Sequence, residues 1–188
     1  MRIVAGVFKG KKILEPKDLK TRPLKDLTKE SIFNIIYHSN KFQLDIKNSN
    51  ILDLFSGVGS FGIECLSRGV DNVTFVENYS GVLPVLRKNL QSLKSITNYQ
   101  ILESDINDLK LFKKFEKRFD LIFLDPPYKD KNLTLLLSNI RDQKILNKDG
   151  IIIIHRHKKE QDIIPEYFKV VEKKNYGVSK IIFLSVLN

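Results

Sequence analysis

The residues from Ile51 to Glu64 constrain the fold of this chain more than any other stretch. The segment begins with a short apolar run, as in a buried strand, and continues through a glycine-rich turn into a helical pattern. Its glycines, at positions 57, 59 and 62, follow the spacing G-x-G-x-x-G. At a strand-to-helix junction this spacing is typical of nucleotide-binding turns, because glycine tolerates positive φ and lets a ligand approach the main chain.

After residue 50 the chain alternates predicted strands with predicted helices. Such alternation favours an α/β fold with a parallel, doubly wound sheet. The strands are predicted at residues 51–55, 72–77, 99–103, 120–125, 150–155, 168–175 and 180–187. The helices are predicted at 60–67, 80–95, 106–116 and 132–145, with Ser80 as an N-cap that leaves Pro84 in the first turn. Only residues 176–179 separate the last two strands, so we expect an antiparallel hairpin at one edge of the sheet.

The first forty residues do not follow this alternation and are predicted to form a small extension of the core. Two glycines favour a short β-hairpin with strands at residues 2–5 and 11–14, and two prolines favour an extended arm at 15–24. Asp26 is a suitable N-cap for a helix to about Tyr37, because apolar residues recur on one face. We therefore predict one domain, 1–188, in which 1–40 form the basic extension and 50–188 form the core.

The chain carries a formal net charge of +10 over 188 residues, and much of the excess lies near its start. The first thirty residues hold nine lysines and arginines against four acids. Such a concentration indicates a polyanionic partner bound through its phosphates, and an ordinary lysine-rich surface is the alternative. The candidate contacts are Arg2, Lys9, Lys11, Lys12, Arg22, Lys25 and Lys29.

Composition argues against several other classes of protein. No apolar run approaches the roughly 20 residues of a membrane helix, and the N-terminus lacks the apolar region of a signal peptide, so we expect a cytoplasmic protein. The single cysteine, Cys65, excludes an intramolecular disulfide and a cysteine-rich zinc site. His155 and His157 would need further ligands to hold a metal, so we predict none and interpret them, with Lys158 and Lys159, as a basic edge facing the polyanion.

Acidic residues stand at or near the ends of three predicted strands: Asp53, Glu77 and Asp105. The carboxyl ends of parallel strands border the crevice in which such folds bind ligands, so we expect all three to face one ligand. A dinucleotide needs free amides for its pyrophosphate, whereas S-adenosylmethionine carries an ammonium and a sulfonium and favours acids near the turn. Asp53 suits the amino-acid end of that cofactor, Glu77 the ribose hydroxyls of either cofactor, and Asp105 the adenine amino group.

The fourth strand runs into Asp125-Pro126-Pro127-Tyr128, and this motif decides between the two cofactors. An exocyclic amine is a poor nucleophile because its lone pair is delocalised into the ring. Asp125 and the Pro126 carbonyl can each accept one amine proton, which turns the lone pair toward a methyl donor, and the carboxylate can take the released proton. The prolines fix the main chain, and Tyr128 offers a face on which an extruded base can stack. The motif therefore favours methyl transfer to an amine.

With these motifs the chain resembles the RsmD family of bacterial 16S rRNA guanine-N2 methyltransferases, which are class I S-adenosylmethionine-dependent enzymes. The Asp-Pro-Pro-Tyr motif is shared with adenine-N6 and cytosine-N4 enzymes, and the N-terminal block is what indicates this family. The similarity covers nearly the whole chain and is carried by residues 1–6, 9–12, 21–23, 29–34, 53–59, 62–64, 66–69, 75–77, 125–128 and 176–177.

The resemblance implies a Rossmann-like, seven-stranded class I methyltransferase sheet. It also implies a monomer that methylates a guanine of 16S rRNA, within the small ribosomal subunit or an assembly intermediate of it. The candidate cofactor-binding residues are Asp53, Phe55, Gly57, Gly59, Gly62, Glu77 and Asp105. The candidate catalytic residues are Asp125, Pro126, Pro127 and Tyr128, which would hold the guanine.

The chain departs from the family pattern at four positions. Leu24 and Lys25 stand where the family usually has two threonines, His155 where it has a glutamate, and Ser179 where it has a threonine. Three other functions stay open. They are an amino methyltransferase acting on adenine N6 of RNA or DNA, a non-catalytic RNA-binding protein of ribosome assembly, and an NAD-dependent oxidoreductase. The intact Asp125 argues against the second, and the third leaves the Asp-Pro-Pro-Tyr motif unexplained.

Overall fold

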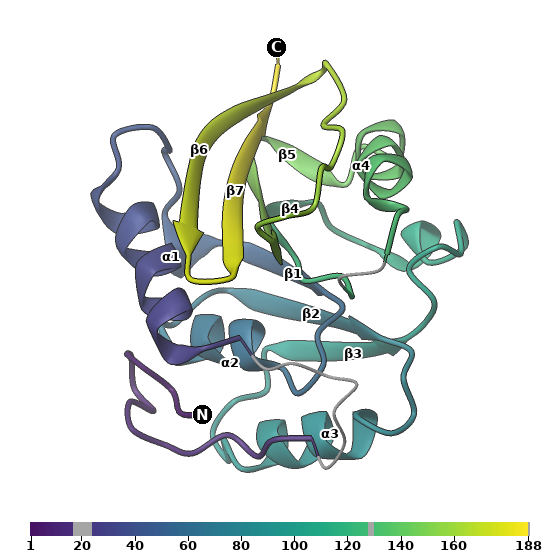
Figure 1. Ribbon diagram of the computed structural model, residues 1–188. Coiled ribbons are helices and arrows are strands. Elements are labelled where there is room, and N and C mark those ends of the chain that lie inside the picture. The colour runs from purple at the N-terminus through teal and green to yellow at the C-terminus, as the bar shows by residue number, and fades with distance from the viewer. Residues whose placement is uncertain (17–23, 128–129, 188) are drawn as a thin grey trace.

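The computed structural model describes residues 1–16, 24–127 and 130–187. Within these residues, seven strands form one sheet in the order β3-β2-β1-β4-β5-β7-β6 (Figure 1). The strands are β1 Asn50–Leu54, β2 Asn72–Glu77, β3 Tyr99–Glu103, β4 Phe119–Leu124, β5 Leu146–His157, β6 Phe168–Tyr176 and β7 Ser179–Val186. Strands β1 to β5 run parallel, and β7 lies antiparallel between β5 and β6. The predicted α/β sheet and its C-terminal hairpin are therefore confirmed, although β5 starts at Leu146 rather than at residue 150.

The direction in which the sheet is built reverses between β1 and β4. From β1 the chain proceeds outward to β2 and β3, and it then returns to add β4 and β5 on the other side of β1. The connections that leave β1 and β4 therefore diverge, and a crevice forms at the carboxyl ends of these two strands. Ligands of doubly wound sheets bind at such a switch point.

Alternate residues of the central strands enter two hydrophobic cores, one on each face of the sheet. Ile151 and Ile153 of β5 pack in a core with residues of α1, α2 and α3, whereas Ile152 and Ile154 pack in a core with α4. Both faces of the central strands are covered, so β1, β4 and residues 151–154 of β5 are apolar almost throughout instead of alternating with polar residues. The helices of the described part of the chain are α1 Asp26–His38, α2 Ser60–Ser67, α3 Leu83–Gln91 and α4 Leu133–Asp142. None of them is long and apolar enough to cross a membrane.

Two predicted N-caps are wrong. Asp26 is the first residue of α1, and Lys25 occupies the N-cap without a hydrogen bond from its side chain. Helix α3 begins at Leu83 with Val82 as its N-cap, so Ser80 lies in the turn before it. Pro84 falls in the first turn of α3, as predicted, where its missing N–H leaves no helical hydrogen bond unmade.

The helix predicted at residues 106–116 is also wrong. This segment consists of turns and one short 3-10 helix, Phe112–Lys114. Two aspartates account for the difference. The Asp105 carboxylate accepts from the Asn107 N–H at 2.8 Å, and the Asp108 carboxylate accepts from the Lys110 N–H at 2.9 Å. Such local bonds from side chain to main chain compete with helix formation.

The predicted N-terminal hairpin is looser than expected. Within the described residues its two arms make one antiparallel bridge, between Arg2 and Lys12, and no regular strand. The Ile3 N–H donates to the Lys11 carbonyl at 2.9 Å, so the arms still lie side by side. Gly6 and Gly10, both at positive φ, allow the chain to reverse between them.

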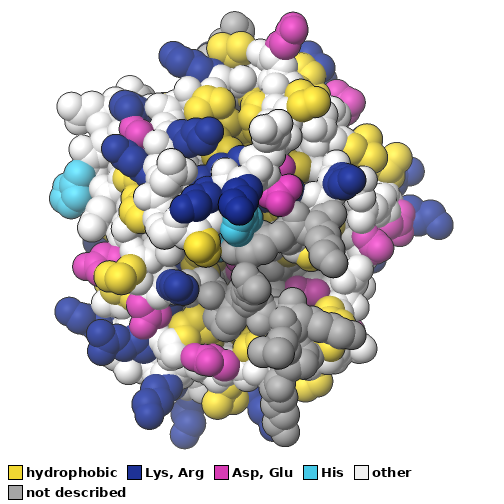
Figure 2. Space-filling model, in the orientation of Figure 1, with side chains coloured by type: hydrophobic (Ala, Val, Ile, Leu, Met, Phe, Trp, Pro, Cys, Tyr) yellow, Lys and Arg dark blue, Asp and Glu magenta, His cyan; other side chains and the backbone are white. Residues whose placement is uncertain are grey.

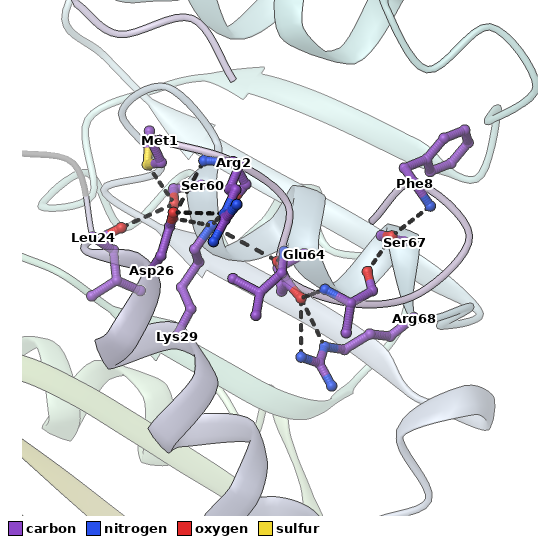
Figure 3. A network of polar contacts seen from close by, with 12 residues as sticks. Met1, Arg2, Phe8, Leu24, Asp26, Lys29, Ser60, Glu64, Ser67 and Arg68 are labelled. Atoms are coloured by element: carbon purple, nitrogen blue, oxygen red, sulfur yellow. Dashed lines mark hydrogen bonds and ion pairs between the residues drawn. The ribbon is translucent and has the colours of Figure 1, made fainter. Parts of the chain in front are cut away.

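Helix α2 holds this N-terminal segment against the core (Figure 3). The buried carboxylate of Glu64 accepts from the Val4 N–H at 2.7 Å and from the Ala5 N–H at 2.9 Å. The Ser67 hydroxyl donates to the Ala5 carbonyl at 2.6 Å. The opening residues are therefore fastened to the core by side chains of the same helix that follows the glycine-rich turn.

Candidate active site

A cavity of about 990 Å³ opens at the carboxyl ends of β1, β2 and β4. The start of α1, the end of β5 and the β6–β7 turn complete its wall. Its described lining includes five carboxyl side chains: Asp53, Glu77, Asp105, Asp125 and Asp130. The other charged or titratable nitrogen groups of that lining are Lys25 and His155. In a protein of net charge +10, this cavity is acidic and suits a ligand that carries positive charge.

The glycine-rich turn enters the cavity with an unusual backbone. Phe55, Gly57 and Gly59 have φ angles of 59°, 54° and 83°. Positive φ in a phenylalanine costs of order 1–3 kcal/mol, and such strain is concentrated at ligand sites. Phe55 and Gly57 line the cavity, whereas Gly59 and Gly62 are not part of its lining. A Cβ on Gly62 would lie 2.3 Å from the ring of Phe75, so this glycine lets α2 pack closely on β2.

Asp53 is buried at the end of β1, beside the start of α2. Its Oδ2 accepts from the Gly62 N–H at 2.9 Å. Burial raises the pKa of Asp53 well above its usual value, the Gly62 hydrogen bond opposes that shift, and the charges of Asp125 and Glu77 raise the pKa further. A positively charged ligand group in the cavity would offset these unfavourable interactions.

Glu77 is held in one orientation at the end of β2. Its Oε2 accepts from the Gly57 N–H at 2.8 Å, and its Oε1 accepts from the N–H groups of Asn78 and Tyr79 at 3.0 and 2.9 Å. Carboxylate oxygens have more than one lone pair, so Glu77 can also accept from ligand hydroxyls. Asp105 lies on the same cavity, and its Oδ1 accepts from the main-chain and side-chain amides of Asn107.

Two carboxylates and one carbonyl occupy the amides that a pyrophosphate would need. Gly57 N–H donates to Glu77, Gly62 N–H donates to Asp53, and Gly59 N–H donates to the Ser56 carbonyl at 2.8 Å. Phosphates bind at helix N-termini through free amides and the positive end of the helix dipole. Here the Gly57 and Gly62 amides already donate to negatively charged side chains, which disfavours a dinucleotide at this turn.

The Asp125 carboxylate faces the cavity beside a histidine. Asp125 Oδ1 lies 2.7 Å from His155 Nδ1. The interpretation of His155 as part of a basic edge facing a polyanion is wrong, because His155 is buried in the cavity wall. Pro126 and Pro127 also line the cavity, and Tyr128 lies outside the described residues. Among the described residues, no group of three or more His, Cys, Asp or Glu could hold a metal ion.

Arg156 supports the same motif, and sequence reasoning missed it. Its side chain is fully buried. The guanidinium donates to the Pro127 carbonyl at 3.1 Å and to the Asp130 carbonyl at 2.8 Å. The role of Arg156 could have been predicted from its position at the end of a predicted central strand, because a charged residue that is buried there needs polar partners.

The predicted polyanion contacts divide into four groups, of which the fourth is Lys29 alone. Arg22 lies outside the described residues. Lys11 is half-buried, and its ammonium donates to the Ser92 carbonyl. The exposed candidates are Arg2, Lys9, Lys12 and Lys25. Figure 2 shows Lys and Arg side chains spread over one face of the molecule, with several gathered just above the middle of the view.

Lys29 was wrongly predicted as a contact, because its side chain is fully buried. Its ammonium donates to the Arg2 carbonyl at 2.6 Å and lies 3.4 Å from Asp26 and 3.8 Å from Glu64. Burial lowers the pKa of Lys29, and the two carboxylates oppose that shift. The burial of Lys29 could have been predicted from the helical period, because residues three apart share a helix face and Ile32 is buried on that face.

Comparison with known proteins connects this site to a family. A family model described as "Conserved hypothetical protein 95" matches residues 1–185. A relative from Bacillus subtilis, provisionally named the rRNA methyltransferase YlbH, is 34% identical and covers 96% of both chains. The Ribosomal RNA small subunit methyltransferase D of Haemophilus influenzae is 31% identical over 95% of this chain and 90% of its own.

A solved structure from Haemophilus influenzae, provisionally named a methylase, superimposes with a TM-score of 0.75 at 30% identity. It covers 100% of this chain and 98% of its own. The strand order described above is therefore that of a class I methyltransferase. The chain belongs to the family of Conserved hypothetical protein 95, the RsmD family that its sequence motifs indicate.

Proposed function

We propose that this protein transfers a methyl group from S-adenosylmethionine to the exocyclic N2 of a guanine in 16S rRNA. One observation carries the proposal: Asp125 of the amine-binding motif faces the same acidic cavity as Asp53 and Glu77. The names of the relatives support rRNA of the small subunit as the substrate. The choice of guanine N2 rests on the RsmD resemblance of the sequence.

The donor groups of the cavity fit S-adenosylmethionine. The cofactor supplies an electrophilic methyl group on a sulfonium. Asp53 would hold its amino-acid end, Glu77 its ribose hydroxyls and Asp105 its adenine amino group. The volume of about 990 Å³ is at the upper end of the range for small-molecule sites, which leaves room for a base beside the cofactor. The occupied amides of the turn argue against the NAD-dependent alternative.

Asp125 and Pro126 would prepare the amine for attack. One oxygen of Asp125 and the Pro126 carbonyl would each accept one N2 proton, which directs the nitrogen lone pair at the methyl group. Positioning of this kind accounts for much of the rate enhancement in group transfer. The Asp125 carboxylate then takes the proton that the methylated amine releases.

The rRNA would dock through phosphates. Arg2, Lys9, Lys12 and Lys25 are exposed, and Lys25 also lines the cavity. These residues would place the RNA across the entrance while one base enters the cavity. We further propose that a monomer acts on the small subunit or its assembly intermediate, where the target base is held in a fixed shape.

Labelled S-adenosylmethionine offered with unmodified small subunits, naked rRNA and DNA tests the proposal. After digestion to nucleosides we expect the label in N2-methylguanosine from small subunits, and less from naked rRNA. Label confined to adenine or cytosine would refute the guanine assignment. Binding of the cofactor without transfer to any substrate would favour the assembly-protein alternative.

Asp125→Ala separates the two motifs. Transfer should fall roughly 10²- to 10⁴-fold, the range for loss of a general base, while cofactor binding measured by calorimetry stays within a few-fold of wild type. Collapse of cofactor binding in this variant would contradict the assignment of Asp125 to the amine.

A further inference from the structure

His155 and Asp125 lie at the carboxyl ends of neighbouring parallel strands. Leu124 of β4 is paired with Ile154 of β5, so the next residue of each strand stands beside the other. His155 Nδ1 is 2.7 Å from Asp125 Oδ1, and the two side chains are 10% and 20% exposed. The distance is that of a charge-assisted hydrogen bond, and the pair is largely shielded from water.

The main chain of the motif is fixed from the other face of the sheet. Successive side chains of a strand point to opposite faces, so Arg156 points away from His155. Its guanidinium holds the carbonyls of Pro127 and Asp130, and its Nε donates to Asp162 at 3.0 Å. With these carbonyls held, rotation of the Asp125 side chain is the main freedom left to the amine-binding group.

That rotation matters because the cavity is acidic. Asp53 and Glu77 face Asp125 across the cavity, and the charges of Asp125 and Glu77 raise the pKa of Asp53. Repulsion from these carboxylates would turn the Asp125 carboxylate away from them. Among the described lining residues, Asp105, Asp130 and Lys25 are the other charged groups. The imidazole of His155 is the lining group seen to hold Asp125 directly.

We propose that His155 is a positioning residue for methyl transfer: its Nδ1–H holds Oδ1 of Asp125, so that Oδ2 points at the substrate amine. This inference rests on the proposed function. The RsmD resemblance leads one to expect a glutamate at this position, and a glutamate could donate to Asp125 only when protonated. The pair is therefore a feature of this chain's own sequence.

Two substitutions test this role. His155→Leu removes the hydrogen-bond donor and fills its buried position with an apolar side chain. His155→Asn retains a donor, because its amide nitrogen is two bonds from Cβ, as Nδ1 is, but it cannot take up a proton at neutral pH. The matched controls are His38→Leu and His38→Asn, at the exposed end of α1. Methyl transfer to small subunits is measured under single turnover, together with the cofactor Kd and the apparent Tm.

We expect the rate of transfer in His155→Leu to fall roughly 10- to 100-fold, as for loss of a hydrogen bond to a charged group. The cofactor Kd and the small-subunit concentration that gives half of the maximal single-turnover rate should change less than threefold. His155→Asn should recover at least a third of the wild-type rate. A His155→Leu enzyme as fast as wild type would overturn the proposal. A His155→Asn enzyme as slow as His155→Leu would overturn it too, since it would show that a hydrogen-bond donor at this position is not sufficient.

The tautomer of His155 gives a readout that does not depend on activity. In long-range ¹H–¹⁵N spectra at pH 8, we expect the Nδ1 of His155 to carry the proton and to shift in Asp125→Asn. A neutral imidazole protonated on Nε2 would overturn the proposal even in an active enzyme. If wild type transfers no methyl to guanine while Nδ1 is protonated, the proposed function fails and the hydrogen bond itself stands.

Discussion

Replacement of Glu64 by glutamine is expected to destabilise the protein far more than loss of an ordinary ion pair. The Glu64 carboxylate is fully buried and accepts from the N–H groups of Val4 and Ala5 (Figure 3). It also pairs with Arg68 at 3.0 Å and with Lys29 at 3.8 Å. A glutamine amide keeps the shape but turns an NH₂ group toward one of these donors. It also leaves the buried Lys29 ammonium and the partly buried Arg68 guanidinium with less compensation.

The expected loss follows from that arrangement. Removal of one partner of a buried ion pair costs about 3–5 kcal/mol. For a chain of this size, each kcal/mol lowers the melting temperature by about 2–4 °C, so the expected decrease is about 6–20 °C. The matched control is Glu103→Gln, because Glu103 pairs with Arg87 on the surface and both side chains are about half exposed. Such a pair contributes less than about 1 kcal/mol.

Urea unfolding and hydrogen exchange together check this prediction. The free energy of unfolding of Glu64→Gln and Glu103→Gln should differ by at least about 2 kcal/mol. In Glu64→Gln, exchange at the Val4 and Ala5 amides should accelerate more than exchange in the central strands, because the N-terminal segment loses its main attachment. Equal stabilities of the two variants would refute the assignment of Glu64 as the residue that fastens this segment.

Two further predictions concern charge. The double variant Lys9→Ala/Lys12→Ala should bind RNA with a weaker salt dependence. The slope of log K against log salt should decrease by about one for each phosphate that is no longer bound. Lys29→Met should leave this slope unchanged, because Lys29 is buried. An equal reduction in Lys29→Met would contradict its burial. Asp53→Asn should abolish cofactor binding, yet unfold at pH 8 with a free energy equal to or up to about 2 kcal/mol above that of wild type. The pKa of Asp53 is raised in the folded state, so ionisation of Asp53 lowers the free energy of unfolding of wild type as the pH rises above about 4, the pKa in the unfolded state. The difference in free energy of unfolding between the two proteins should therefore disappear as the pH falls to about 4. A less stable Asp53→Asn protein at pH 8, measured by urea unfolding, would contradict this sign.

Most strands could be predicted from sequence because short runs rich in β-branched and aromatic residues recur between turn residues. Residues 72–77 and 99–103 form strands with the predicted bounds, and the carboxyl ends of the central strands meet where the switch-point rule places them. The helix at 106–116 could not be excluded in the same way. Its apolar spacing favours a helix, and the competing turns depend on the rotamers of Asp105 and Asp108.

The site residues that sequence reasoning missed are defined by contacts between strands. His155 and Asp125 are 30 residues apart in sequence, and only the register of β4 with β5 brings them together. Residues 155–159, His-Arg-His-Lys-Lys, have the composition of a basic surface. Burial separates these residues, since His155 and Arg156 lie inside and Lys158 and Lys159 lie outside. A composition rule averages over that boundary and therefore gives the buried His155 the same role as the exposed Lys158 and Lys159.

The same separation of charge suits a protein that binds a polyanion but acts on one of its bases. Exposed lysines attract phosphates, and the combined field of a chain with net charge +10 favours the approach of a polyanion. Inside the cavity the five carboxyl groups repel phosphate at distances well below the screening length of about 8 Å at physiological salt. A base extruded from the RNA is uncharged and can enter where its phosphate cannot. Acidic side chains that hold a cationic cofactor would therefore also keep the RNA backbone at the entrance and admit only the base.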